Sequence, residues 1–187
     1  MSSPRVYRDA DASLEALAGE RIAGLGYGNQ GRSQALNLRD SGLDVVVGVR
    51  NDETRAAAAA EGFAVHEPAE AVAGADVVML LIPDEVMPEV FEEHVRPGLR
   101  AGACVEVASG YNLAFGHVDP PAEADVVMVA PRMIGPGVRE LYLAGQGFPS
   151  FVGVHRDATG RARERMLALA RGVGSTRAGC LALSCAD

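Results

Sequence analysis

The most informative stretch of this chain is RIAGLGYGNQG, residues 21–31. It begins as a short apolar run, which predicts a buried strand, and it ends with the glycine spacing G-x-G-x-x-G. Residues 32–41 follow with apolar side chains at helical spacing, and residues 45–47 form a second apolar run. Because the chain has 22 glycines, the spacing alone carries little weight. The order of strand, glycine turn, helix and strand is what predicts a Rossmann-type turn.

Each glycine of this turn has its own expected task. Gly26 makes the tight turn, Gly28 lets the backbone approach a pyrophosphate, and Gly31 lets the helix pack closely on the strand. The N-terminus of the helix then offers free N–H groups and a positive dipole end to phosphate oxygens. The sequence therefore predicts a dinucleotide site at this turn.

Strands and helices alternate along the rest of the chain. We expect further strands at residues 63–65, 77–82, 103–107, 125–129, 150–154 and 181–183, and helices at residues 53–61, 68–73, 85–94 and 159–171. This alternation is typical of an α/β fold with a doubly wound, mostly parallel, Rossmann-like sheet. A single domain is expected over residues 1–187, with a lead-in at residues 1–20 and a core at residues 21–183.

Ligands of such sheets bind outside the carboxyl ends of the strands. In this chain those ends follow Leu25, Gly48, Ile82, Val107 and Val129. Three features there have both a structural and a functional interpretation. Pro83-Asp84 can simply start a helix, Ser109-Gly110 can be an ordinary turn, and Arg132 can be a solvated loop arginine. Their expected meeting in one crevice favours the functional interpretation.

Length and charge limit the classes of function. The chain has 187 residues, which suit one domain, and a net charge of −8 without a long basic run, which argues against a nucleic-acid partner. No apolar stretch approaches the ~20 residues of a membrane span. Residues 1–5 lack the apolar core of a signal peptide. We therefore expect a cytoplasmic protein that acts on a small-molecule substrate.

The three cysteines have no zinc-like spacing, and no metal site is predicted. Cys104 lies in a strand-like run and is expected in the core. Cys180 and Cys185 either join in a disulfide or stay reduced, the state typical of the cytoplasm. The four histidines are scattered and are expected at the surface or at helix caps.

Several motifs, in order along the chain, closely resemble ketol-acid reductoisomerase. The matching stretches are residues 6–11, 22–31, 34–42, 46–50, 76–79, 81–85, 127–131 and 174–179. That family isomerises and reduces 2-acetohydroxy acids with NADPH and two magnesium ions, and the resemblance implies an N-terminal Rossmann domain followed by a helical domain that holds the metals. This chain stops at Asp187, about where the helical domain should begin, so we expect no Mg²⁺ and no metal-dependent alkyl shift.

The resemblance also implies contacts with the cofactor. The pyrophosphate would lie against Tyr27, Gly28, Asn29 and Gln30, between the flanking glycines. Arg50 would lie beside the adenine ribose, and Gly135 close to the cofactor. The residues expected near the nicotinamide are Pro83, Asp84, Glu85, Val86 and Met87.

The loop after the second strand leaves the choice between NADH and NADPH open. Asp52 or Glu53 can accept a hydrogen bond from a free ribose hydroxyl and repel a 2′-phosphate, and Thr54 lies in the same loop. Arg50 and Arg55 favour NADPH instead. The balance favours NADH slightly, although acids at a helix start also have a purely structural role.

Two substitutions alter the chemistry of the expected active site. Ser109 stands where the family has a histidine, and Arg132 stands where it has a lysine after Ala-Pro. A serine hydroxyl cannot transfer a proton near pH 7 as histidine does, and arginine binds a carboxylate but stays protonated. The expected catalytic residues are therefore Ser109, as a hydrogen-bond donor, and Arg132, as a carboxylate ligand.

Three functions stay open. The favoured one is an NAD(P)H-dependent oxidoreductase that reduces a small ketone or imine without the magnesium-dependent alkyl migration. The chain could instead be a dinucleotide-binding module without turnover, or the N-terminal half of a complete or two-chain ketol-acid reductoisomerase. We also expect a homodimer, because a second copy would cover the apolar edge that a missing domain leaves.

Overall fold

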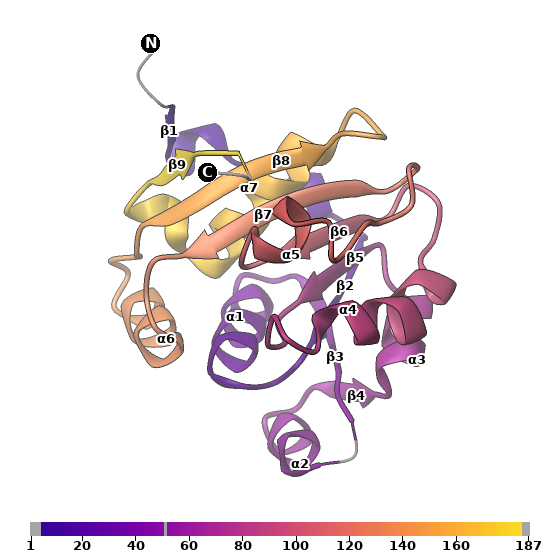
Figure 1. The fold of residues 1–187 in the computed structure, drawn as a ribbon. Coiled ribbons are helices and arrows are strands. Elements are labelled where there is room, and N and C mark those ends of the chain that lie inside the picture. Colours follow the sequence, from indigo (N-terminus) through magenta and orange to yellow (C-terminus); the bar gives the residue numbers. More distant parts are fainter. Residues whose placement is uncertain (1–4, 51, 185–187) are drawn as a thin grey trace.

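The computed structural model describes residues 5–50 and 52–184 and shows one sheet with helices on both faces (Figure 1). The strands of this sheet are β1 (Val6–Tyr7), β2 (Arg21–Leu25), β3 (Asp44–Gly48), β4 (Ala64–His66), β5 (Val77–Leu80), β6 (Cys104–Val107), β7 (Asp125–Pro131), β8 (Ser150–Arg156) and β9 (Cys180–Ala182). The α-helices are α1 (Asn29–Asp40), α2 (Glu53–Ala60), α3 (Pro68–Ala73), α4 (Met87–Val90), α5 (Tyr111–Ala114), α6 (Gly135–Leu143) and α7 (Ala162–Val173). Short 3-10 turns at Asp9–Asp11 and Leu14–Leu17 precede β2.

The sheet order is β1-β9-β8-β7-β6-β5-β2-β3-β4. Only the pairs β7–β8 and β1–β9 are antiparallel among the described strands; the other neighbours are parallel. The strand β8 is antiparallel because the chain leaves β7 at Pro131 and re-enters the sheet beside it at Ser150. The expected doubly wound, mostly parallel Rossmann-like fold is therefore confirmed.

Burial on both faces explains the continuous apolar sequence of the central strands. Every residue of β5 and β6 is buried. On one face, α1, α6 and α7 pack on the sheet through side chains such as Leu38, Val138 and Leu169. On the other face, α3 and α5 contribute Val72 and Leu113. Figure 1 shows β1 and β9 at one edge of the sheet and β4 with α2 at the other.

Some helices differ from the sequence-based expectation. The helix expected at residues 85–94 begins only at Met87, because Pro88 lacks an N–H and fits only the first turn of a helix. It then widens into a π-helix at Phe91–Val95. The helices α5 and α6 were not expected, since α5 is short and α6 opens with Gly135-Pro136-Gly137, residues typical of turns.

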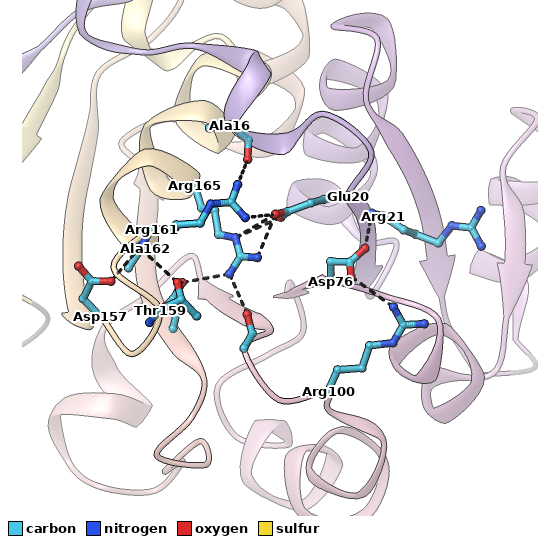
Figure 2. A network of polar contacts seen from close by, with 12 residues as sticks. Ala16, Glu20, Arg21, Asp76, Arg100, Asp157, Thr159, Arg161, Ala162 and Arg165 are labelled. Atoms are coloured by element: carbon cyan, nitrogen blue, oxygen red, sulfur yellow. Dashed lines mark hydrogen bonds and ion pairs between the residues drawn. The ribbon is translucent and has the colours of Figure 1, made fainter.

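Ion pairs gather at the amino ends of the strands (Figure 2). The glycine turn lies at the other end of the strands, after the carboxyl end of β2. The buried Arg165 of α7 binds Glu20 of the lead-in at 2.9 Å and Asp125, the first residue of β7, at 3.0 Å. Arg161 binds Glu20 from the solvent side at 2.8 Å. The lead-in is thereby fixed to α7 and to the sheet.

The Cys104 thiol is buried in β6, as expected for a core residue, and burial raises its pKa. Cys180 is buried in β9, and Cys185, its possible partner, lies outside the described residues. Within residues 5–50 and 52–184, none of the helices combines the length and apolar character that crossing a membrane requires.

Candidate functional site

The glycine turn has the geometry of a phosphate-binding loop. Gly26 has a φ of 98°, and a Cβ there would lie 2.6 Å from the carbonyl oxygen of Leu81. A Cβ at Gly31 would lie 2.2 Å from the carbonyl oxygen of Gly26, so both positions require glycine. A Cβ at Gly28 would meet nothing within 4 Å. The open space at Gly28, directly before the start of α1 at Asn29, fits the pyrophosphate of a dinucleotide.

Two side chains of the turn, those of Tyr27 and Gln30, form hydrogen bonds with neighbouring segments of the protein. The Tyr27 ring is buried, and its hydroxyl donates a hydrogen bond to Glu61 Oε2 at 2.6 Å. Gln30 Nε2 donates to the carbonyl oxygen of Met133 at 2.8 Å. The turn therefore presents its backbone, including the N–H groups of the first turn of α1, to a ligand.

A cavity of about 430 Å³ opens beside the turn, at the carboxyl ends of β2, β3 and β5. Its lining includes these predicted residues: Gly26, Tyr27, Gly28, Arg50, Asp52, Thr54, Pro83 and Val86. It also includes Glu89, Glu93 and His94, none of which the sequence analysis predicted as a site residue; the histidine was expected at the surface or at a helix cap. The helix expected at residues 85–94 places these three residues near the site. The sequence does not show which face of that helix is turned toward the cavity.

The loop after β3, which lines this cavity, is organised by a helix cap at Asp52. Asp52 Oδ1 accepts hydrogen bonds from the Thr54 backbone N at 2.9 Å and from Thr54 Oγ1 at 2.6 Å, and these bonds hold the pKa of Asp52 below its usual value. Arg55 binds Glu67 at 2.9 Å, whereas Arg50 is exposed. The structural role foreseen for Asp52 is thus present, and the carboxylate is charged at neutral pH.

One buried asparagine side chain joins the loop after β5 to the helix α5. Asn112 Nδ2 donates to both the backbone oxygen and Oδ1 of Asp84 at 3.1 Å, and it lies 3.4 Å from the sulfur of the buried Met87. Asp84 and Glu85 line a second cavity of about 430 Å³ together with Tyr111. No sequence pattern predicted the role of Asn112, because its partners lie 25 and 28 residues away.

Ser109 and Arg132 line a third cavity, of about 490 Å³, at the carboxyl ends of β6 and β7. Ser109 Oγ accepts a weak hydrogen bond from the Tyr111 backbone N at 3.3 Å. The exposed Arg132 guanidinium stacks on the Phe151 ring, 4.9 Å from its centroid. The expected single crevice is therefore divided: the two predicted catalytic residues line one cavity, and the glycine turn lines another.

Gly135 lies against the glycine turn rather than in a cavity. A Cβ there would be 2.2 Å from the carbonyl oxygen of Asn29, so the start of α6 and the start of α1 touch through their backbones. Among residues 5–50 and 52–184, no three histidine, cysteine, aspartate or glutamate side chains gather in a way that could hold a metal ion.

The fold and the glycine turn define a dinucleotide-binding domain of the Rossmann type. A family model described as acetohydroxy acid isomeroreductase, NADPH-binding domain, matches residues 16–179. The chain belongs to this family of oxidoreductases, as the resemblance to ketol-acid reductoisomerase predicts.

Individual relatives agree with this assignment. The ketol-acid reductoisomerase (NADP(+)) of Pyrobaculum arsenaticum is 53% identical over 98% of this chain and 56% of that protein, and the enzyme of Pyrobaculum calidifontis is 52% identical over the same shares. The solved structure of an NADH-preferring ketol-acid reductoisomerase from an uncultured archean has a TM-score of 0.94 and 36% identity, over 96% of this chain and 56% of that chain. This chain thus spans little more than half the length of these relatives.

Proposed function

We propose that the chain binds NAD(P)H across these cavities and reduces a small ketone or imine, without the magnesium-dependent alkyl migration. The observation that carries the proposal is the pairing of an intact phosphate turn with an altered third cavity that holds Ser109 and Arg132. Tyr111 lines both the second and the third cavity, so the expected nicotinamide side lies next to the expected substrate side.

The cofactor is held by the residues already described around the first two cavities. The backbone of the glycine turn binds the pyrophosphate, the loop with Asp52 and Thr54 binds the adenine ribose, and Asp84 and Glu85 lie at the nicotinamide side. When bound, a reduced nicotinamide supplies a hydride.

Arg132 binds a carboxylate of the substrate through its planar guanidinium, which the Phe151 ring supports. Ser109 Oγ already accepts from the Tyr111 N–H, which leaves its own hydrogen free to donate to a carbonyl oxygen or imine nitrogen. This donation stabilises the charge that develops on that atom. Because serine has no accessible pKa near neutrality, the proton that completes the product comes from water.

The charged Asp52 favours NADH slightly over NADPH, since a carboxylate repels a 2′-phosphate. The matching family model is described as NADPH-binding, whereas the similar solved structure is that of an NADH-preferring enzyme. The proposed preference for NADH therefore rests on Asp52 and not on family membership.

A second candidate is favoured by the length of the relatives. The chain covers 56% of the Pyrobaculum arsenaticum enzyme, and the same domain would serve as the nucleotide-binding part of a complete or two-chain ketol-acid reductoisomerase. In the stand-alone case we expect a homodimer, which gel filtration of the purified protein measures.

The first experiment is a fluorescence titration of the purified protein with NADH and, separately, with NADPH. Micromolar binding of either supports the site, and oxidation of the bound cofactor by small 2-oxo acids or imines in the presence of EDTA supports the reductase. Binding without turnover, followed by turnover once Mg²⁺ and a helical domain from a relative are added, favours the second candidate. Binding of neither cofactor contradicts the stand-alone reductase.

A further inference from the structure

We propose that Glu61 is a positioning residue, which holds the glycine turn in the shape that a pyrophosphate requires. Glu61 follows α2 directly, and it is not among the residues that line the three cavities. The inference rests on the proposed dinucleotide binding and adds to it a residue that touches no ligand.

The Glu61 carboxylate receives hydrogen bonds from both sides of the glycine turn. Tyr27, between the first two glycines, donates its hydroxyl hydrogen to Oε2 at 2.6 Å. Arg32, directly after the third glycine, donates from Nε to the same oxygen at 2.9 Å and also contacts Oε1 through its second nitrogen. One carboxylate therefore bridges the residues that flank positions 28–31.

Glu61 is itself held in place by neighbouring side chains. Arg39 donates to the backbone oxygen of Glu61 at 2.6 Å, and its guanidinium stacks on Phe63 at 4.7 Å from the ring centroid. The Tyr27 ring packs edge-on against the same phenylalanine, with 5.7 Å between centroids. A bidentate arginine–carboxylate pair with a third, charge-assisted bond has little freedom to rotate.

The pKa shifts of the two partners keep the Glu61 carboxylate charged and the Tyr27 hydroxyl protonated at neutral pH. The hydrogen bond from Arg32 is the main cause of a lowered pKa at Glu61. Burial, and then the hydrogen bond to Glu61, raises the pKa of Tyr27, so the phenol stays protonated and keeps donating. The hydrogen bond to Glu61 holds the Tyr27 side chain in its buried position. The backbone of Gly26 and Gly28 on either side of Tyr27 is thereby held in place before a ligand binds.

A loop that is ordered in advance loses less entropy on binding, so Glu61 should act on affinity for phosphates. The test compares Glu61→Gln with Glu92→Gln as a matched control. Glu92 forms an equally bidentate pair with Arg96, at 2.7 and 2.8 Å, but it contacts no part of the glycine turn. Both changes remove one negative charge from an arginine pair.

We expect Glu61→Gln to weaken binding of NADH and of ADP-ribose by about tenfold, the equivalent of about 1.4 kcal/mol. Binding of adenosine, which lacks the diphosphate, should stay within about twofold, and Glu92→Gln should bind all three ligands like the unchanged protein. Isothermal titration calorimetry measures these affinities. A general loss of structure would weaken adenosine binding as well, and that result would overturn the inference.

Tyr27→Phe tests the same link without changing a charge. It keeps the ring against Phe63 and removes only the hydroxyl that binds Glu61. If both residues act through this bond, the double variant binds ADP-ribose no more weakly than Glu61→Gln alone. Fully additive losses, or NADH binding by Glu61→Gln at normal strength, overturn this inference alone. Failure of the unchanged protein to bind either cofactor overturns the proposed function together with it.

Discussion

At the scale of single residues, the most unusual side chain is Glu106, in the middle of the sheet. It is completely buried in β6, and its Oε1 accepts a hydrogen bond from the Val129 N–H at 3.3 Å. Its Oε2 has no hydrogen-bond partner among the described residues. Burial raises the pKa of Glu106 to about 8, so this acid is largely protonated at neutral pH.

This burial predicts a stability that falls with rising pH. Below pH 4.5, Glu106 is protonated in both the folded and the unfolded chain. Between pH 4.5 and about 8 it is protonated only when folded, so the free energy of unfolding drops by about 1.4 kcal/mol for each pH unit. Urea denaturation of Glu106→Gln and of the unchanged protein at pH 5, 6.5 and 8 checks this. Parallel pH profiles for the two proteins would contradict it.

A second residue-scale prediction concerns cofactor choice. Asparagine caps a helix about as well as aspartate, so Asp52→Asn should keep the bond to Thr54 and unfold at nearly the same temperature. Removing the charge should shift the ratio of NADPH to NADH affinity upward by about three- to tenfold. Parallel titrations with the two cofactors measure the ratio, and an unchanged ratio would leave Asp52 with its capping role alone.

At the scale of elements, two glycines of the turn should have different roles: Gly28 in binding, and Gly31 in packing. Gly28→Ala places a methyl group in open space, so the variant should fold normally but bind NADH at least tenfold more weakly, because the methyl group occupies the approach of the phosphate. Gly31→Ala forces a Cβ onto the Gly26 carbonyl and should lower the unfolding temperature as well. Thermal unfolding and cofactor titration distinguish the two variants. A strongly destabilised Gly28→Ala would show that the space is not open.

At the scale of the whole molecule, the ion pairs at the amino ends of the strands hold the lead-in to the core. Arg165→Met leaves Asp125 buried without its charged partner, and it should lower the free energy of unfolding by about 3–5 kcal/mol. Arg161→Met removes an exposed partner of Glu20 and should cost less than about 1 kcal/mol. Chemical denaturation compares the two. Equal losses would mean that burial of the pair does not govern its contribution.

The candidate site was predictable where it depends on local backbone geometry. The spacing of Gly26, Gly28 and Gly31 after an apolar strand predicted both the turn and its place at the carboxyl end of β2. The contacts of Asn112 and Glu61 were not predictable, because each joins residues 22 or more positions apart. The start of α4 differs from the expected residue 85 because Pro88, which fits only the first turn of a helix, sets it at Met87.

The sequence by itself determined the alternation of elements, the doubly wound sheet and the glycine turn, since strand burial and glycine spacing are properties of short segments. Only the tertiary structure decided that Ser109 and Arg132 share a cavity separate from the one beside the glycine turn, and that the Tyr27 hydroxyl binds Glu61. Those relations depend on strand order and on how the helices pack across the sheet. They arise from contacts between residues far apart in the sequence, and the spacing of residues along the chain does not predict such contacts.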